Sequence, residues 1–380
     1  QWTLGTWALG ITNFNASYFS INTFATNGTG GFANAFSGTF TLTSSNNSIF
    51  LNYLGAASGP PIYSAGAGTW STNFTPALTQ GATNWIFDGA TGGAATNDIA
   101  SATGNTLGTL TFSNTAGSYT LSAASGSAGY DAASALAITG NIVNNSANAQ
   151  TINLALGFSN AATINAAAGH MTFGGAISNG TSLTFTGASN NTVSGAIGGA
   201  GYLVKDGAGT LTLADNNSYG GATTISNGTL SAGVLANAGS NSSLGTNATV
   251  TFAGANATNT VLNYTGGNVT TDRTFAFNGT ASSGEGGTIA IGTSTTVTAT
   301  GAASGTGKMI VGEGTLVLSN TTTPNSFAPA AIQVDTGATL ALAADNQIGN
   351  STGLILNGGT FLTGTSSAGY SDSLGTLTLS

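Results

Sequence analysis

The 380-residue chain contains no cysteine and very few charges, with three Lys and Arg, eleven Asp and Glu, and a formal net charge of −8. Ordinary globular chains carry roughly 25% charged residues, whereas this one has 4%, so groups for ion pairs and acid–base catalysis are scarce. Lys205, Arg273 and Lys308 are too few to neutralise a phosphate backbone. The composition therefore argues against nucleic acid and anionic membranes as partners, and the absence of cysteine excludes disulfides and thiol catalysis.

Long apolar runs are also missing, because Gly, Asn or Thr interrupts every hydrophobic stretch well before the roughly 18 residues that a spanning helix needs. We therefore expect no membrane insertion of this chain. The sequence starts at Gln1 without an initiator Met, a charged leader or an apolar leader. Such a start is expected of a mature product whose signal peptide has been removed, which predicts an extracellular or cell-surface location.

Short segments of alternating apolar and small polar residues recur along the chain, as in Thr210-Leu211-Thr212-Leu213. A period of two is typical of strands, and clusters such as Ser226-Asn227-Gly228 are typical of turns. Strands of this kind can build a sandwich, a barrel or a solenoid. The triplet Gly-Thr-Leu recurs at residues 108, 209, 228, 314 and 375, and repeated strand–turn units of roughly 20 to 30 residues favour a solenoid. We predict an all-β fold, a right-handed parallel β-helix with an aromatic-rich N-terminal β segment.

The low charge agrees with stacked coils. Equivalent residues of neighbouring coils lie about 4.8 Å apart, so identical charges at repeated positions would repel each other. Apolar side chains can instead stack inside the coil while Thr and Asn occupy its surface. The solenoid interpretation thus explains why charged residues are dispensable.

Residues 197–230 read IGGAGYLVKDGAGTLTLADNNSYGGATTISNGTL. This stretch closely resembles the autotransporter-associated β-strand repeat, with Lys205, Asn217 and Tyr219 on its pattern. A degenerate second copy covers residues 305–340 and lacks the central lysine. The resemblance extends over roughly residues 67–380, and it implies a secreted or surface-displayed β-helical protein of bacteria.

The first segment has a different composition from the rest. All four tryptophans precede residue 90, and Pro60-Pro61 marks a break. We divide the chain into an aromatic-rich β segment at residues 1–66, a cap or inter-subunit strand region, and a β-solenoid at residues 67–380. Residues 36–56 resemble the strand pair that ends a module in such proteins.

The last residues stop in mid-pattern at Ser380. A bare terminal coil exposes apolar side chains and unpaired backbone groups, so we expect the C-terminal coil of one subunit to dock on the N-terminal segment of the next. Contacts of this type that do not close produce filaments. A proteolytic end or a sequence boundary at Ser380 is the alternative. The expected interface comprises Trp2, Trp7, Phe14, Tyr18, Phe19, Leu374, Leu377 and Leu379.

Candidate catalytic groups are few. His170 is the single histidine, so zinc sites and serine–histidine triads have no basis. Asp206 and Asp215 could approach each other as a glycosidase pair, but Lys205-Asp206 lies inside the repeat and is better interpreted as a turn or ladder position. We predict no catalytic residue, no metal site and no cofactor.

The sequence thus predicts a non-enzymatic extracellular structural protein, self-associating head-to-tail into a filament, sheath or surface layer. The first alternative is an autotransporter-type adhesin passenger that binds glycans or cells. A carbohydrate-active β-helix enzyme is the second alternative.

Overall fold

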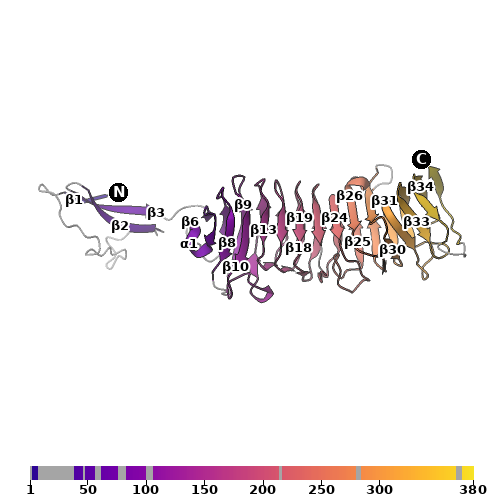
Figure 1. Ribbon diagram of the computed structural model, residues 1–380, viewed down its shortest axis with the longest axis horizontal. Coiled ribbons are helices and arrows are strands. Elements are labelled where there is room, and N and C mark those ends of the chain that lie inside the picture. Colours follow the sequence, from indigo (N-terminus) through magenta and orange to yellow (C-terminus); the bar gives the residue numbers. More distant parts are fainter. Residues whose placement is uncertain are drawn as a thin grey trace, which may run out of the picture. The chain divides into compact units, whose positions relative to one another are not determined.

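The computed structural model describes residues 2–6, 38–45, 48–55, 61–75, 83–99, 106–213, 216–279, 284–364 and 370–380 (Figure 1). The chain divides into two compact units, Gln1–Pro61 and Ile62–Ser380. The domain boundary predicted after residue 66 stays a prediction.

The first unit is a three-stranded antiparallel sheet in the order β1-β3-β2. Its strands are β1 (Trp2–Thr6), β2 (Gly38–Ser45) and β3 (Ser48–Gly55). β2 and β3 pair along their whole length, from Gly38 opposite Gly55 to Ser45 opposite Ser48. The outer strands β1 and β2 each pair with β3 alone among the described residues.

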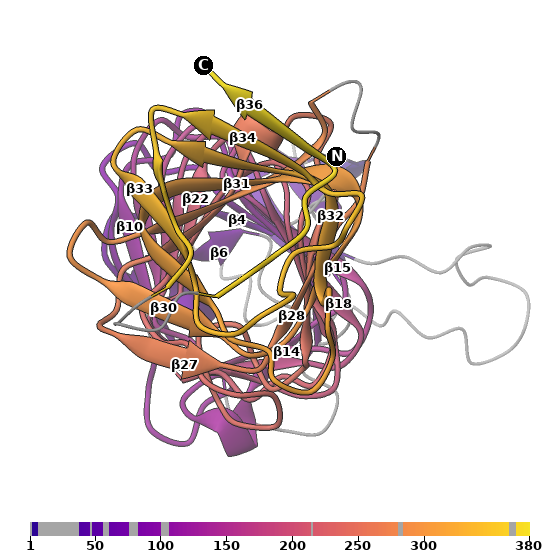
Figure 2. The same cartoon turned by 90° about the vertical axis from the view of Figure 1, so that its right-hand side faces the viewer.

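The second unit is a parallel β-solenoid, in which each strand pairs with the equivalent strand of the next coil. Figure 2 views this unit along its length and shows strands on several sides of the coil, with β34 and β36 on one, β30 and β33 on another, and β15 and β18 on a third. The parallel β-helix prediction is confirmed, and the arrangement is consistent with the right-handed form.

The strands form long stacks, and their bounds are as follows. One stack contains β5 (Gly68–Thr69), β8 (Gly93–Asn97), β10 (Tyr119–Ala123), β13 (Gln150–Ile152), β16 (Met171–Phe173), β19 (Asn191–Val193), β22 (Thr210–Leu213), β24 (Gly228–Ala232), β26 (Thr260–Tyr264) and β29 (Gly286–Ile291). A second contains β4 (Ile62–Tyr63), β7 (Thr83–Phe87), β9 (Thr106–Phe112), β12 (Ile142–Asn144), β15 (Ala162–Asn165), β18 (Ser182–Thr186), β21 (Tyr202–Lys205), β23 (Thr223–Ile225), β25 (Thr249–Phe252) and β28 (Thr274–Phe277).

Shorter stacks complete the coils. One contains β11 (Leu136–Ile138), β14 (Leu156–Phe158), β17 (Ile177–Asn179) and β20 (Ile197–Gly198). Another contains β27 (Val269–Thr271), β30 (Thr296–Ala299), β33 (Ala338–Leu342) and β35 (Thr360–Leu362). The long strand β31 (Ala303–Leu318) joins the stacks, and β32 (Phe327–Asp335), β34 (Gly353–Asn357) and β36 (Thr376–Leu379) follow it.

Strand alternation creates the core, because every second residue points inward. In β22, Leu211 and Leu213 are buried while Thr210 and Thr212 are half-buried on the outer face. The buried apolar side chains form one cluster that runs from Tyr63 to Leu354. Dispersion and burial along this continuous interior stabilise neighbouring coils, so the fold needs few ion pairs.

The first coil of the solenoid is covered. The single-turn helix α1 (Trp70–Asn73) and the strand β6 (Phe74–Thr75) lie there, and β6 pairs antiparallel with β4. Trp70 is fully buried, and its ring meets that of Trp85 edge-on at 5.1 Å between centroids. Aromatic side chains therefore close this end of the apolar interior.

Candidate functional site

The expected interface residues fall into two groups. Trp7, Phe14, Tyr18 and Phe19 lie outside the described residues, and Trp2 is described only by its backbone in β1. The interface on the first segment therefore stays a prediction.

The other three expected residues lie on the last coil. Leu374 is half-buried and packs on the core, whereas Leu377 and Leu379 are 59% and 73% exposed on β36. β36 pairs with β34 through Leu377 opposite Leu354 and Leu379 opposite Leu356. Within the described chain its other edge has no partner strand. Among the described residues the last strand therefore has exposed leucine side chains and one edge without a partner strand, whereas aromatic side chains cover the first coil.

A buried lysine lies in the middle of the repeat. Lys205 is the last residue of β21 and is 2% exposed, in register between Phe185 and Ile225. Its Nζ donates to the carbonyl oxygens of Asp206, Gly207 and Asn227 at 2.7–2.9 Å. Burial lowers the pKa of Lys205 to about 8, while nearby Asp206 opposes this shift. The side chain therefore fastens the turns of two successive coils from inside, a more specific role than the predicted turn or ladder position.

A buried arginine fastens a longer loop between β24 and β25. The guanidinium of Arg273 donates to the carbonyl oxygens of Ala236 and Gly245 at 2.9 and 2.6 Å, and to the Ser242 Oγ at 3.1 Å. A further bond reaches the carbonyl of Asn247. Arg273 has no exposed surface, and burial lowers its pKa. Both buried cations thus satisfy backbone carbonyls in the interior.

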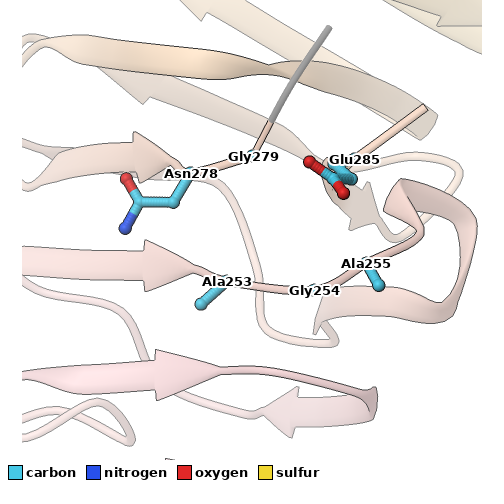
Figure 3. Close-up of a pocket in the computed structure, with 6 residues that line it drawn as sticks. All are labelled: Ala253, Gly254, Ala255, Asn278, Gly279 and Glu285. Carbon is cyan, nitrogen blue, oxygen red and sulfur yellow. The ribbon is translucent and has the colours of Figure 1, made fainter. Parts of the chain in front are cut away.

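Two adjoining cavities open where the strands of the second stack end. The larger, about 480 Å³, is lined by Asp206, Ser226, Asn227, Ala253, Ala255, Asn256, Asn259 and Thr260. The smaller, about 240 Å³, is lined by Ala253, Gly254, Ala255, Asn278, Gly279 and Glu285 (Figure 3). We call the two together the asparagine groove, because they share Ala253 and Ala255 and carry four asparagines.

The local sequence explains the groove. After β25 the chain leaves the strand and forms the short 3-10 helix η3 (Ala257–Asn259) before β26 begins. The Asn256 side chain caps η3 by accepting from the backbone N of Thr258 at 2.9 Å. The preceding coil has a shorter turn at this position, since only Ser226 and Asn227 separate β23 from β24, and η3 therefore forms one wall of the groove. The small residues Ala253 and Gly254 leave its floor open.

Of the catalytic candidates, the structure describes His170 and Asp206 but not Asp215. His170 Nε2 lies 3.1 Å from the Thr172 Oγ1, and Asp215 lies outside the described residues, so the Asp206–Asp215 pair is not tested. Within the described chain no three His, Asp or Glu side chains gather as a metal site would require. The helices described are all too short or too polar to cross a membrane.

The parallel β-helix and its repeat are similar to those of autotransporter passengers. The family model of the passenger-associated transport repeat matches residues 203–232, which confirms the resemblance seen in residues 197–230. The degenerate copy at residues 305–340 stays a prediction.

One curated relative supports this similarity. A stretch of 123 residues, 31% of this chain, is 40% identical to the Adhesin BmaC autotransporter of Brucella suis biovar 1 (strain 1330). The stretch covers 3% of that relative's length. No solved structure matches the chain at a significant level.

Proposed function

We propose that this chain is a surface-exposed, non-enzymatic structural β-solenoid that self-associates head-to-tail. The observation that carries the proposal is the contrast between the two ends of the solenoid unit. Aromatic side chains close the first coil, whereas β36 leaves Leu377 and Leu379 exposed and one backbone edge unpaired. Unpaired strand edges are templates for adding another strand.

The proposed occupant of the last coil is the antiparallel sheet of a second copy. That sheet has two outer strands, β1 and β2, each with one edge that no described strand covers. Strand addition would supply the missing hydrogen bonds, and burial of the two leucines would add roughly 1.5–3 kcal/mol each. Because the donor and acceptor surfaces differ, the contact is heterologous, and it extends a filament when the rotation between subunits does not close a ring. Location at the surface is supported by the relative, which is named an autotransporter adhesin.

Assembly can be measured on the purified chain by light scattering and electron microscopy over a range of concentrations. We expect concentration-dependent linear oligomers, and we expect the double variant Leu377→Asp, Leu379→Asp to remain monomeric. Tyr202→Asp is the matched control, because Tyr202 is 58% exposed in the middle of the solenoid. A wild-type chain that stays monomeric at every concentration would falsify the head-to-tail proposal.

An adhesin passenger is the second candidate function. Two observations favour it, the 40% identity to an autotransporter adhesin and a groove lined by hydrogen-bonding side chains. Mixing labelled chain with host-type cells or immobilised glycans tests it, and adhesion with no assembly would favour this candidate over the structural one.

A further inference from the structure

The asparagine groove has the chemistry of a binding site. We propose that it binds an extended, neutral, hydroxyl-rich saccharide. This inference rests on the adhesin candidate and gives it a location on the molecule and a ligand class.

Uncommitted hydrogen-bonding atoms are concentrated in the groove. The Asn227 Oδ1 accepts from the backbone N of Gly228 at 2.9 Å, and the Asn256 Oδ1 accepts from Thr258. These bonds hold the two amides in place while their Nδ2 groups have no protein partner among the described residues. Asp206 adds an exposed carboxylate. Amide donors beside a carboxylate acceptor match sugar hydroxyls, because each hydroxyl both donates and accepts.

The charge of the groove selects against acidic ligands. Its lining contains Asp206 and Glu285 but no Lys, Arg or His. The ammonium of Lys205, which precedes Asp206, lies in the interior and donates to three carbonyl oxygens, and the ammonium of Lys308 bonds Gln333. A ligand carrying carboxylate, sulfate or phosphate would therefore meet only like charge. Neutral amide and hydroxyl side chains outnumber the two carboxylates, which favours a neutral saccharide over a cationic peptide.

The register of the coils gives the groove its length. Lys205, Ile225, Phe252 and Phe277 are successive register partners, so the residues that follow them, Asp206, Ser226, Ala253 and Asn278, form a column. Three coil spacings of about 4.8 Å make this column about 14 Å long. Such a column suits several linked sugar rings, and Figure 3 shows Asn278 and Glu285 at its far end, on either side of Gly279.

The expected affinity is low. No aromatic ring lines the groove, so the stacking that strengthens many sugar complexes is missing. Hydrogen bonds exchanged with water contribute little net free energy each. We therefore expect dissociation constants on the order of 1 mM, about −4 kcal/mol.

The test uses the full chain and saturation-transfer NMR titrations with maltotriose, cellotriose and chitotriose, and with trigalacturonic acid as the acidic counterpart. At least one neutral trisaccharide should bind, and trigalacturonic acid should bind at least fivefold more weakly. Ala253→Trp fills the floor at the point that both cavities share and should abolish binding, while Asp206→Asn and Asn278→Ala should each weaken it about threefold.

Two controls match these variants in size and charge. Thr192→Trp places the same ring on the outer face of β19, and Glu313→Gln removes an exposed carboxylate elsewhere; both should bind as the wild type does. The proposal is overturned if no neutral trisaccharide binds, if Ala253→Trp binds normally, or if tetralysine binds through Asp206 in place of the sugars. Light scattering on the same samples reports assembly separately, so failure of binding is distinguishable from failure of the head-to-tail proposal.

Discussion

Lys205 is a charged residue that stabilises the turns from inside an apolar interior. Its ammonium donates hydrogen bonds to three backbone carbonyl oxygens at the turns of successive coils. No other described group donates to these oxygens. Burying a charge is costly unless hydrogen bonds compensate for lost hydration. The lysine is therefore tied to the turn geometry of the repeat rather than to catalysis.

Replacing the lysine tests this role. Lys205→Met keeps the stem but leaves the carbonyl oxygens of Asp206, Gly207 and Asn227 without their donor, so we expect the unfolding free energy to fall by about 2 kcal/mol. Chemical denaturation followed by circular dichroism measures this change. Lys308→Met is the control, since Lys308 is half-buried and its Nζ donates to the side chain of Gln333, at 3.0 Å, and to no backbone carbonyl among the described residues. Equal stability of the two variants would argue against the turn-fastening role.

The lowered pKa of Lys205 predicts a pH dependence. Folding lowers this pKa from 10.5 to about 8, so between pH 8 and 10.5 the unfolded chain binds more protons than the folded chain. The contribution of Lys205 to stability therefore rises with pH in this window. Above about pH 10 the buried Tyr219, whose pKa burial raises, acts in the opposite direction. Denaturation midpoints at pH 7.5 and 9.5 should show a larger gap between wild type and Lys205→Met at pH 9.5, and a constant gap would contradict this account.

At the scale of single elements, alternation predicted the strands well and the loops poorly. Leu183 and Phe185 lie inward on β18 as the period of two requires. The same alternation places Lys205 on the inward face with Leu203 and so indicates its burial, which the turn or ladder interpretation does not include. Arg273 directly precedes β28, and the alternation that buries Phe275 and Phe277 also places Arg273 on the inward face. The loop that Arg273 holds could not be predicted, because its acceptors are backbone carbonyls whose positions depend on the folded loop.

The loop between β24 and β25 should depend on that arginine. Arg273→Met removes the guanidinium donors to the carbonyls of Ala236, Gly245 and Asn247, so we expect a loss of about 3 kcal/mol and faster amide exchange across residues 236–247. Hydrogen exchange read by mass spectrometry locates the effect. Arg273→Lys retains the charge without the fork of donors and should give a smaller change. Exchange that accelerates uniformly along the solenoid would show that Arg273 does not act on the loop.

At the scale of the whole molecule, the fold class could be predicted from the sequence. Strands with a period of two and turns rich in Gly, Asn and Ser recur at nearly constant spacing. The asparagine groove could not be predicted in the same way, because its lining comes from several coils between Asp206 and Glu285. Bringing those residues together requires the register of each coil, which depends on turn lengths. The turn that carries η3 is longer than the turn between β23 and β24, and composition alone gives no measure of this difference.

The register also gives a direct test of why charges are scarce. Thr192, Thr212 and Ser231 are successive partners on the outer faces of β19, β22 and β24. Changing all three to Asp places carboxylates about 4.8 Å apart, and each adjacent pair should cost up to about 0.9 kcal/mol beyond the sum of the single variants. The triple Asn variant has the same shape without charge and should show no such excess. Because the Debye length falls to about 3 Å in 1 M salt, sodium chloride should remove most of the excess in thermal denaturation. An excess that persists in high salt, or that the Asn variant shares, would mean that side-chain shape rather than repulsion keeps Asp and Glu out of the stacked coils.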